Sequence, residues 1–137
     1  MSWQPPIVGA TASITKLVTA DDVELFARLT GDRNPLHFDE AFARQTRFGR
    51  LVAQGGITAG LFNALVAMQL PGPGSVFLHQ EWDYPAPVYI GDTVTAEVVV
   101  VSARADKPIT NLECVARNQD GVEVLRGTCV VYRMLPS

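Results

Sequence analysis

Residues 30–37 read Thr-Gly-Asp-Arg-Asn-Pro-Leu-His and form the stretch of the chain best suited to proton transfer. Asp32 supplies a carboxylate, and His37, five residues later, supplies an imidazole that changes charge near neutral pH. Two such groups can share one water molecule and move its protons. Gly31 and Pro35 set the backbone that aims the two side chains. We therefore expect any catalysis by this chain to centre on Asp32 and His37.

Taken alone, this pair has a purely structural alternative. In that alternative Asp32 caps a turn, and His37 is a partly buried histidine without a chemical role. Asn34 lies between them and is suited to bracing the loop through Asx-type hydrogen bonds rather than to moving protons. The surrounding sequence is needed to choose between the two interpretations.

The segments on either side of the pair carry signals for the elements that must position it. Thr19 and Asp22 have the spacing of a capping box, with Asp where Glu or Gln is more usual, and Asp39 is suited to capping a further helix. Apolar residues then recur at helical spacing. The sequence predicts a strand at residues 11–18, a helix from 19 to about 31, a loop at 32–37 and a short helix around 41–43.

A longer apolar helix is predicted to begin at Gly55-Gly56 and to continue to Leu70, before Pro71-Gly-Pro-Gly74 ends it. Its apolar residues lie almost all round, so we expect the rest of the fold to enclose it. The period then changes to that of strands, which we expect at residues 76–84, 93–104, 109–117 and 122–134, the last three as an antiparallel meander. An α+β fold of the hot-dog type, a long antiparallel sheet wrapped around a central helix, accommodates both features.

Composition narrows the class of protein. The 137 residues, 47% hydrophobic and 18% charged, suit one globular domain over 1–137, and a net charge of -3 argues against a nucleic-acid partner. The N-terminus has no secretory-signal pattern, and the longest apolar stretch, 56–70, is too short to span a bilayer comfortably. Cys114 and Cys129 lack metal-site spacing and are expected to be buried free thiols. We therefore expect a cytoplasmic protein that uses neither a metal nor a membrane.

The sequence from Phe26 to His37, followed by Ala43, resembles the hydratase motif of the MaoC-like dehydratases, and is most similar to the short (R)-specific enoyl-CoA hydratases. The Asp-x-Asn-Pro-x-His element is its most specific part. The resemblance continues in collinear order over nearly the whole chain, through Phe48–Arg50, Val52–Gly55, Leu70–Gly74 and Pro87–Glu97.

This resemblance implies a lyase activity, the reversible syn addition of water to a trans-2-enoyl-CoA, giving an (R)-3-hydroxyacyl-CoA. Asp32 and His37 would be the acid–base pair, and the backbone N–H of Gly55 would meet the thioester oxygen. No cofactor is implied, because coenzyme A is part of the substrate. A homodimer paired edge to edge is implied, as is a place in fatty acid metabolism or in the supply of polyhydroxyalkanoate precursors.

Three positions near the implied site differ from the residues that the relatives carry, namely Gln54, Gly56 and Asn63. Gln54 and Gly56 depart from the His and Met common in the relatives, and we expect Gly56 to loosen the segment around Gly55. Asn63 occupies the place of a serine and is expected either to hydrogen-bond the water or the carboxylate, or to be a satisfied core amide. Asn34, Asn63 and Val66 are the residues assigned to substrate binding, with Val66 setting the acyl chain length.

Arg44, Arg47 and Arg50 recur every three residues and are candidates for binding the phosphates of coenzyme A, although a solvated basic face is an equal alternative. Other functions also stay open. They are dehydration of a specialised or carrier-protein-bound 3-hydroxyacyl thioester, thioester hydrolysis on the same fold, and acyl-CoA binding without catalysis.

Overall fold

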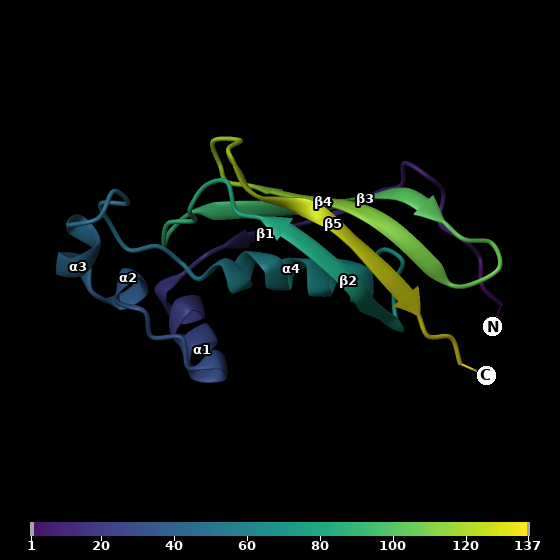
Figure 1. The fold of residues 1–137 in the computed structure, drawn as a ribbon, viewed down its shortest axis with the longest axis horizontal. Coiled ribbons are helices and arrows are strands. Elements are labelled where there is room, and N and C mark those ends of the chain that lie inside the picture. Colours follow the sequence, from purple (N-terminus) through teal and green to yellow (C-terminus); the bar gives the residue numbers. More distant parts are fainter. Residues whose placement is uncertain (1, 137) are drawn as a thin grey trace.

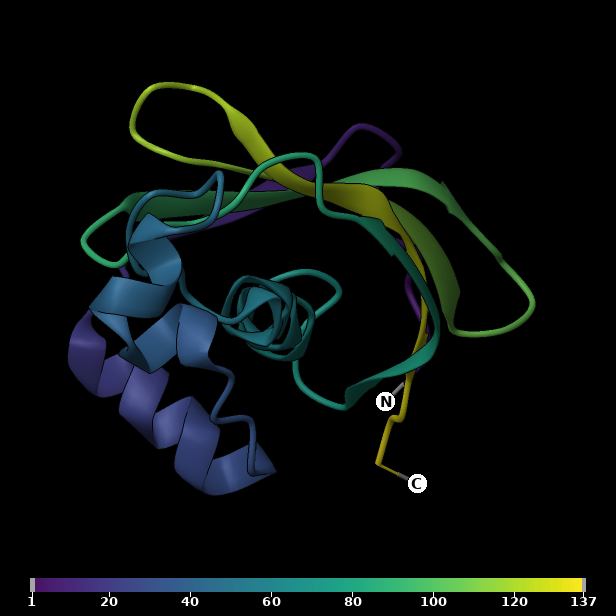
Figure 2. The same cartoon turned by 60° about the vertical axis from the view of Figure 1, so that its left-hand side comes forward.

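A curved antiparallel sheet of five strands forms one layer of the protein, and one long helix, α4, lies against its concave face (Figure 1, Figure 2). The computed structural model describes residues 2–136. The strand order is β1-β3-β4-β5-β2, with β1 at Thr11–Leu17, β2 at Ser75–Asp83, β3 at Thr93–Ala103, β4 at Ile109–Arg117 and β5 at Glu123–Arg133. The predicted hot-dog arrangement and the meander of β3, β4 and β5 are confirmed.

Alternation along the central strands builds the inner face of the sheet. On β3 the side chains of Val94, Ala96, Val98 and Val100 are buried, while their sequence neighbours are at least partly exposed. Because successive side chains of a strand point to opposite faces, these apolar groups pack against α4 and the residues between them lie on the outer face of the sheet. The ends of all five strands lie within one residue of the predicted ends.

Helix α4, Gly55–Met68, supplies the other half of the core. Phe62, Leu65 and Val66 are buried against the sheet, and the Phe62 ring stacks on Trp82 of β2 with centroids 5.3 Å apart. The expectation that this helix is enclosed on all sides is wrong for the single chain, because Asn63 and Met68 are exposed. Helix α4 therefore has apolar residues both on the face that the sheet covers and on a face that this single chain leaves exposed.

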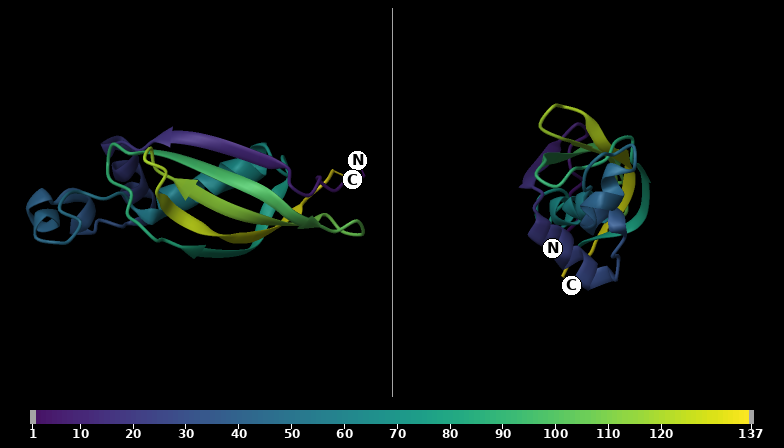
Figure 3. Two further views of the ribbon diagram at one scale, coloured as in Figure 1. Left: turned by 90° about the horizontal axis from the view of Figure 1, so that it is seen from above. Right: turned by 90° about the vertical axis from the view of Figure 1, so that its left-hand side faces the viewer.

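Three helices form an extension at one end of the sheet, away from both chain termini (Figure 3). Helix α1, Ala20–Thr30, begins with the predicted capping box, in which Asp22 N donates to Thr19 Oγ1 (3.2 Å) and Thr19 N donates to Asp22 Oδ2 (2.9 Å). Helix α3, Glu40–Arg44, is capped by Asp39 as expected. The loop predicted at 32–37 is corrected, because residues Pro35–Phe38 form a short helix, α2, and His37 lies on it.

Two further expectations concern the cysteines and the membrane. Cys114 and Cys129 are buried free thiols on neighbouring strands, with sulfurs 3.7 Å apart, as predicted. The hydrogen bond to Cys129, together with burial, raises the pKa of the Cys114 thiol. Within residues 2–136, no helix has the length and apolarity needed to cross a bilayer.

Candidate active site

Asp32 and His37 face each other in the helical extension. Asp32 Oδ2 lies 3.7 Å from His37 Nε2, too far for a direct hydrogen bond but close enough for one water oxygen to contact both atoms. The imidazole is buried, with 8% of the residue exposed, whereas 40% of the Asp32 side chain is exposed. The structure thus brings together the two groups that the sequence singled out, on the border between solvent and core.

Val52 fixes the orientation of the imidazole. His37 Nδ1 lies 2.6 Å from the Val52 carbonyl oxygen, and Val52 N donates to the Leu36 carbonyl (3.1 Å). Because a carbonyl oxygen can only accept a hydrogen bond, Nδ1 carries the proton of this contact. In the neutral ring Nε2 is then the acceptor, and it is Nε2 that faces Asp32. This arrangement suits His37 for taking a proton from water.

The carboxylate of Asp32 is held by the backbone of the turn. Its Oδ1 accepts from Asn34 N (3.1 Å), and Asn34 Oδ1 in turn accepts from Leu36 N (3.1 Å), which caps α2. The predicted bracing role of Asn34 is therefore present. Arg33 is directed elsewhere, since its guanidinium donates two hydrogen bonds to Glu24 and lowers the pKa of that carboxyl. The second oxygen of Asp32 is thereby left to face His37.

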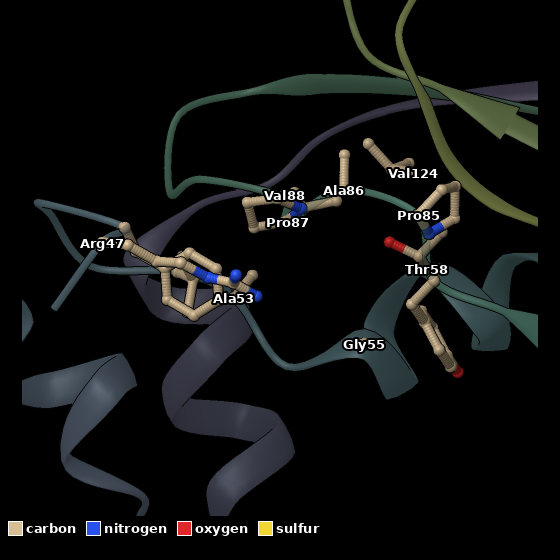
Figure 4. Close-up of a pocket in the computed structure, with 12 residues that line it drawn as sticks. Arg47, Ala53, Gly55, Thr58, Pro85, Ala86, Pro87, Val88 and Val124 are labelled. Carbon is tan, nitrogen blue, oxygen red and sulfur yellow. The ribbon is translucent and has the colours of Figure 1, made fainter.

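A cavity of about 460 Å³ lies beside the first turn of α4 (Figure 4). Its wall is mostly apolar and includes Val52, Ala53 and the segment 85–88, with Gly55 and Thr58 contributed by α4. Asp32 and His37 are not among its lining residues. Val52 belongs to both regions. Its carbonyl oxygen contacts His37, and the residue is part of the cavity wall. The three Cα–Cα steps from Val52 to Gly55 span at most about 11 Å.

Gly55 opens α4 with donors directed out of the helix. Gln54, the N-cap residue, makes no side-chain capping bond, so within residues 2–136 its side chain leaves the first N–H groups of the helix free. A Cβ at residue 55 would lie 2.8 Å from Cε1 of Tyr84, which explains why a glycine is needed here. Such free N–H groups and the positive end of the helix dipole attract a ligand oxygen that gains negative charge.

The two departures from the relatives have packing explanations. A Cβ at residue 56 would lie 2.2 Å from Cζ of Phe26, so this ring occupies the place of a side chain, and packing rather than open space surrounds Gly56. Gln54 is buried, and its Nε2 donates to the Val23 carbonyl (3.1 Å), which ties the start of α4 to α1. Its Oε1 has no partner within residues 2–136.

We expect Gly56→Ala to destabilise the protein by about 1–3 kcal/mol, the usual cost of forcing an extra group into a packed site. The reason is the overlap with the Phe26 ring. Urea unfolding of Gly56→Ala, Phe26→Leu and the double variant measures the coupling between the two positions. A smaller residue at 26 should relieve the overlap, so the double variant should lose less stability than the sum of the single changes. Simple additivity would contradict this explanation.

Asn63 and Val66 lie three residues apart on α4, the first exposed and the second buried. Asn63 is exposed on α4, and its side-chain amide has no hydrogen-bond partner within residues 2–136, so its alternative as a satisfied core amide is wrong. Val66 is buried in the core and does not line the cavity. The roles given to both residues in substrate binding stay predictions.

The three arginines do not all lie at one cavity, because Arg44 and Arg50 line a separate one of about 410 Å³. Arg44 lies 3.5 Å from the Glu40 carboxylate, and Arg50 lies over the Tyr89 ring, 3.9 Å from its centroid. Arg47 is the member of the series that lines the cavity (Figure 4). Helix α3 ends at Arg44, so the three-residue spacing does not place all of them on one helical face.

Two polar residues of the cavity wall, Tyr84 and Thr58, were not singled out from the sequence. Tyr84 packs against Gly55 and lines the cavity, and partial burial raises the pKa of its phenol. Thr58 lies three residues after Gly55 and, like Asn63, is a polar residue in a mostly apolar helix. Because residues three apart are neighbours on a helix, the sequence could have identified Thr58 as a neighbour of Gly55. The contact between Tyr84 and Gly55 is seen only in the folded structure.

Comparison with known proteins gives consistent results. The model of the MaoC-like domain family matches residues 8–121. The (R)-specific enoyl-CoA hydratase of Aeromonas caviae is 44% identical over 96% of this chain and 98% of its own, and the 3-hydroxybutyryl-CoA dehydratase of Methylorubrum extorquens is 42% identical over 90% and 78%. The solved structure of an (R)-hydratase from A. caviae, described as involved in PHA biosynthesis, superimposes with a TM-score of 0.90 at 43% identity, covering 94% of this chain and 98% of that one.

Proposed function

Because this chain belongs to the MaoC-like domain family, we propose that it is an (R)-specific enoyl-CoA hydratase, a hydro-lyase that adds water reversibly to trans-2-enoyl-CoA. The product is an (R)-3-hydroxyacyl-CoA. The observation that carries the proposal is the facing pair of Asp32 Oδ2 and His37 Nε2, 3.7 Å apart, with the opposite ring nitrogen held by Val52.

The proposed reaction begins with a water molecule held by both groups. His37 Nε2 takes one proton as the water oxygen bonds to the β-carbon, and the π electrons of the double bond move toward the thioester. Asp32 holds the other O–H of the water and stabilises the imidazolium that forms, since a carboxylate close to a cation favours its charge. His37 then returns the proton to the α-carbon on the same face, which gives syn addition and restores the neutral ring.

The thioester oxygen gains charge during this addition and needs a donor in place beforehand. The N–H groups at the start of α4, Gly55 first among them, are suited to that role, because no capping side chain uses them. The apolar wall of the adjacent cavity suits an acyl or pantetheine chain. We extend the proposal to Arg47, which lines this cavity, as a contact for a phosphate of coenzyme A. The reaction uses no metal or redox cofactor.

The test is direct. Purified protein incubated with crotonyl-CoA should remove the enoyl absorbance, and chiral analysis should give the (R)-3-hydroxy product. Carrier-protein thioesters run in parallel would identify a dehydratase of carrier-bound substrates if they are turned over much faster than the CoA thioester. Release of free thiol would instead indicate hydrolysis. Tight binding of enoyl-CoA without turnover would refute an enzymatic role.

We also propose that two copies pair through β2, an edge strand of the sheet. The support is the free edge of β2 together with exposed apolar groups, namely Leu78 at 56% and Met68 at 70% exposure. Joining two such edges extends the sheet and covers these groups. We expect sedimentation equilibrium to give twice the chain mass of 14.8 kDa at micromolar concentration. A mass of 14.8 kDa under the same conditions would contradict this pairing.

The A. caviae structure is described as involved in PHA biosynthesis. We propose that this chain likewise supplies (R)-3-hydroxyacyl-CoA precursors to an enzyme that polymerises them.

A further inference from the structure

Thr58 carries a buried hydroxyl that no protein group satisfies. The residue is 2% exposed, and its Oγ1 has no hydrogen-bond partner within residues 2–136. Threonine in a helix often donates to the carbonyl four residues earlier, which here belongs to Gln54, but that bond is not formed. A buried polar group without a partner is unfavourable and is usually explained by an ion, a water or a ligand.

This hydroxyl is directed into the cavity beside α4. Thr58 lines that cavity together with Gly55, and Figure 4 shows its oxygen pointing away from the helix toward the wall formed by Pro87 and Val88. The wall is otherwise mostly apolar. A ligand atom that satisfies the hydroxyl must therefore be polar and must lie near the helix.

The helical spacing places the hydroxyl close to the proposed oxyanion donor. Residues three apart lie on the same helix face, and a helical side chain leans toward the N-terminus. The side chain of Thr58 therefore leans over the first turn, where Gly55 presents its N–H and no capping side chain intervenes. Gln54 Oε1 is also without a partner there, but an amide oxygen can only accept, so it cannot bind an anionic oxygen.

We propose that Thr58 Oγ1 donates a hydrogen bond to the same thioester oxygen that Gly55 N–H contacts, and so acts as a second oxyanion donor. The inference rests on the proposed function, because it takes the thioester to be that of an enoyl-CoA. The hydroxyl binds the carbonyl of the ground state and binds more strongly as negative charge develops on the oxygen.

Two substitutions separate the hydroxyl from the shape of the side chain. Thr58→Val keeps the shape and removes the donor, whereas Thr58→Ser keeps the donor and removes a methyl group. We expect Thr58→Val to lower kcat for crotonyl-CoA on the order of 10²-fold, with little change in KM. Thr58→Ser should stay within a few fold of the parent. Urea unfolding should show Thr58→Val to be at least as stable as the parent, since it loses an unpaired buried group.

A second measurement does not need turnover. Butyryl-CoA labelled with ¹³C at the thioester carbonyl has no double bond to hydrate, and its carbonyl resonance reports hydrogen bonding. When bound to the parent protein or to Thr58→Ser the resonance should move downfield, and with Thr58→Val it should lie nearer to that of the free thioester. Equal resonances in all three proteins, or equal losses of kcat in both variants, would overturn the role of Thr58. A parent that does not hydrate crotonyl-CoA, but still shows the ¹³C difference, would refute the hydratase and leave the hydrogen bond standing.

Discussion

Replacing His37 with glutamine or Asp32 with asparagine is expected to lower kcat for hydration of crotonyl-CoA by about 10²–10⁴-fold, the usual worth of a positioned acid or base. His37→Gln removes the nitrogen that takes the proton from water. Asp32→Asn removes the negative charge that stabilises the resulting imidazolium, and it also puts a donor where the water needs an acceptor. Because both groups act on the water rather than on the thioester, KM should change much less than kcat.

Asp32→Asn is the cleaner of the two variants. Asparagine keeps the oxygen that accepts from Asn34 N, so the turn that positions α2 should survive. Asp106→Asn is a matched control, because Asp106 is an exposed carboxylate paired with Arg104 in the turn between β3 and β4. Stopped-flow measurement of enoyl absorbance, with circular dichroism to check the fold, gives the comparison. If Asp32→Asn and His37→Gln both turn over like the Asp106 control, the assignment of the acid–base pair is wrong.

The strands and the two long helices are predicted well from the sequence because each of them has one dominant local signal. The strands alternate, the capping box at Thr19 starts α1, and Gly55-Gly56 and Pro71–Gly74 bracket α4. The sequence also identifies Asp32 and His37, whose side chains the structure brings to 3.7 Å. In both cases the information lies within a few residues of the feature that it predicts.

The expectations that failed depend on contacts between distant segments or on very short elements. Helix α2 has four residues, too few to show a period, although Asn34 as a cap and Pro35 in the first turn were signals for it. The apolar pattern of α4 shows that its faces need cover, but not which neighbour supplies it. Gly56 was expected to loosen the segment around Gly55, and the sequence did not show that the ring of Phe26, thirty positions earlier, packs against Gly56.

The second large effect is expected from Gly55→Pro, which should lower kcat by about 10²–10³-fold, the usual cost of losing one oxyanion donor. Proline has no backbone N–H and is otherwise well suited to the first position of a helix. Gln54, which precedes it, has φ −65° and ψ 136°, a conformation that a following proline allows. The substitution therefore removes one donor and leaves the start of α4 able to form.

Gly55→Ala separates the donor from the added bulk. Alanine and proline both place a Cβ against the Tyr84 ring, where the gap would be 2.8 Å, but alanine keeps the N–H. The loss that both variants share therefore measures crowding by Tyr84, and the further loss in Gly55→Pro measures the donor. Because the N–H acts on charge that develops during water addition, that further loss should fall on kcat and not on KM. If the two variants have the same kcat, the thioester oxygen is not held by Gly55, and the N-terminus of α4 serves the fold alone.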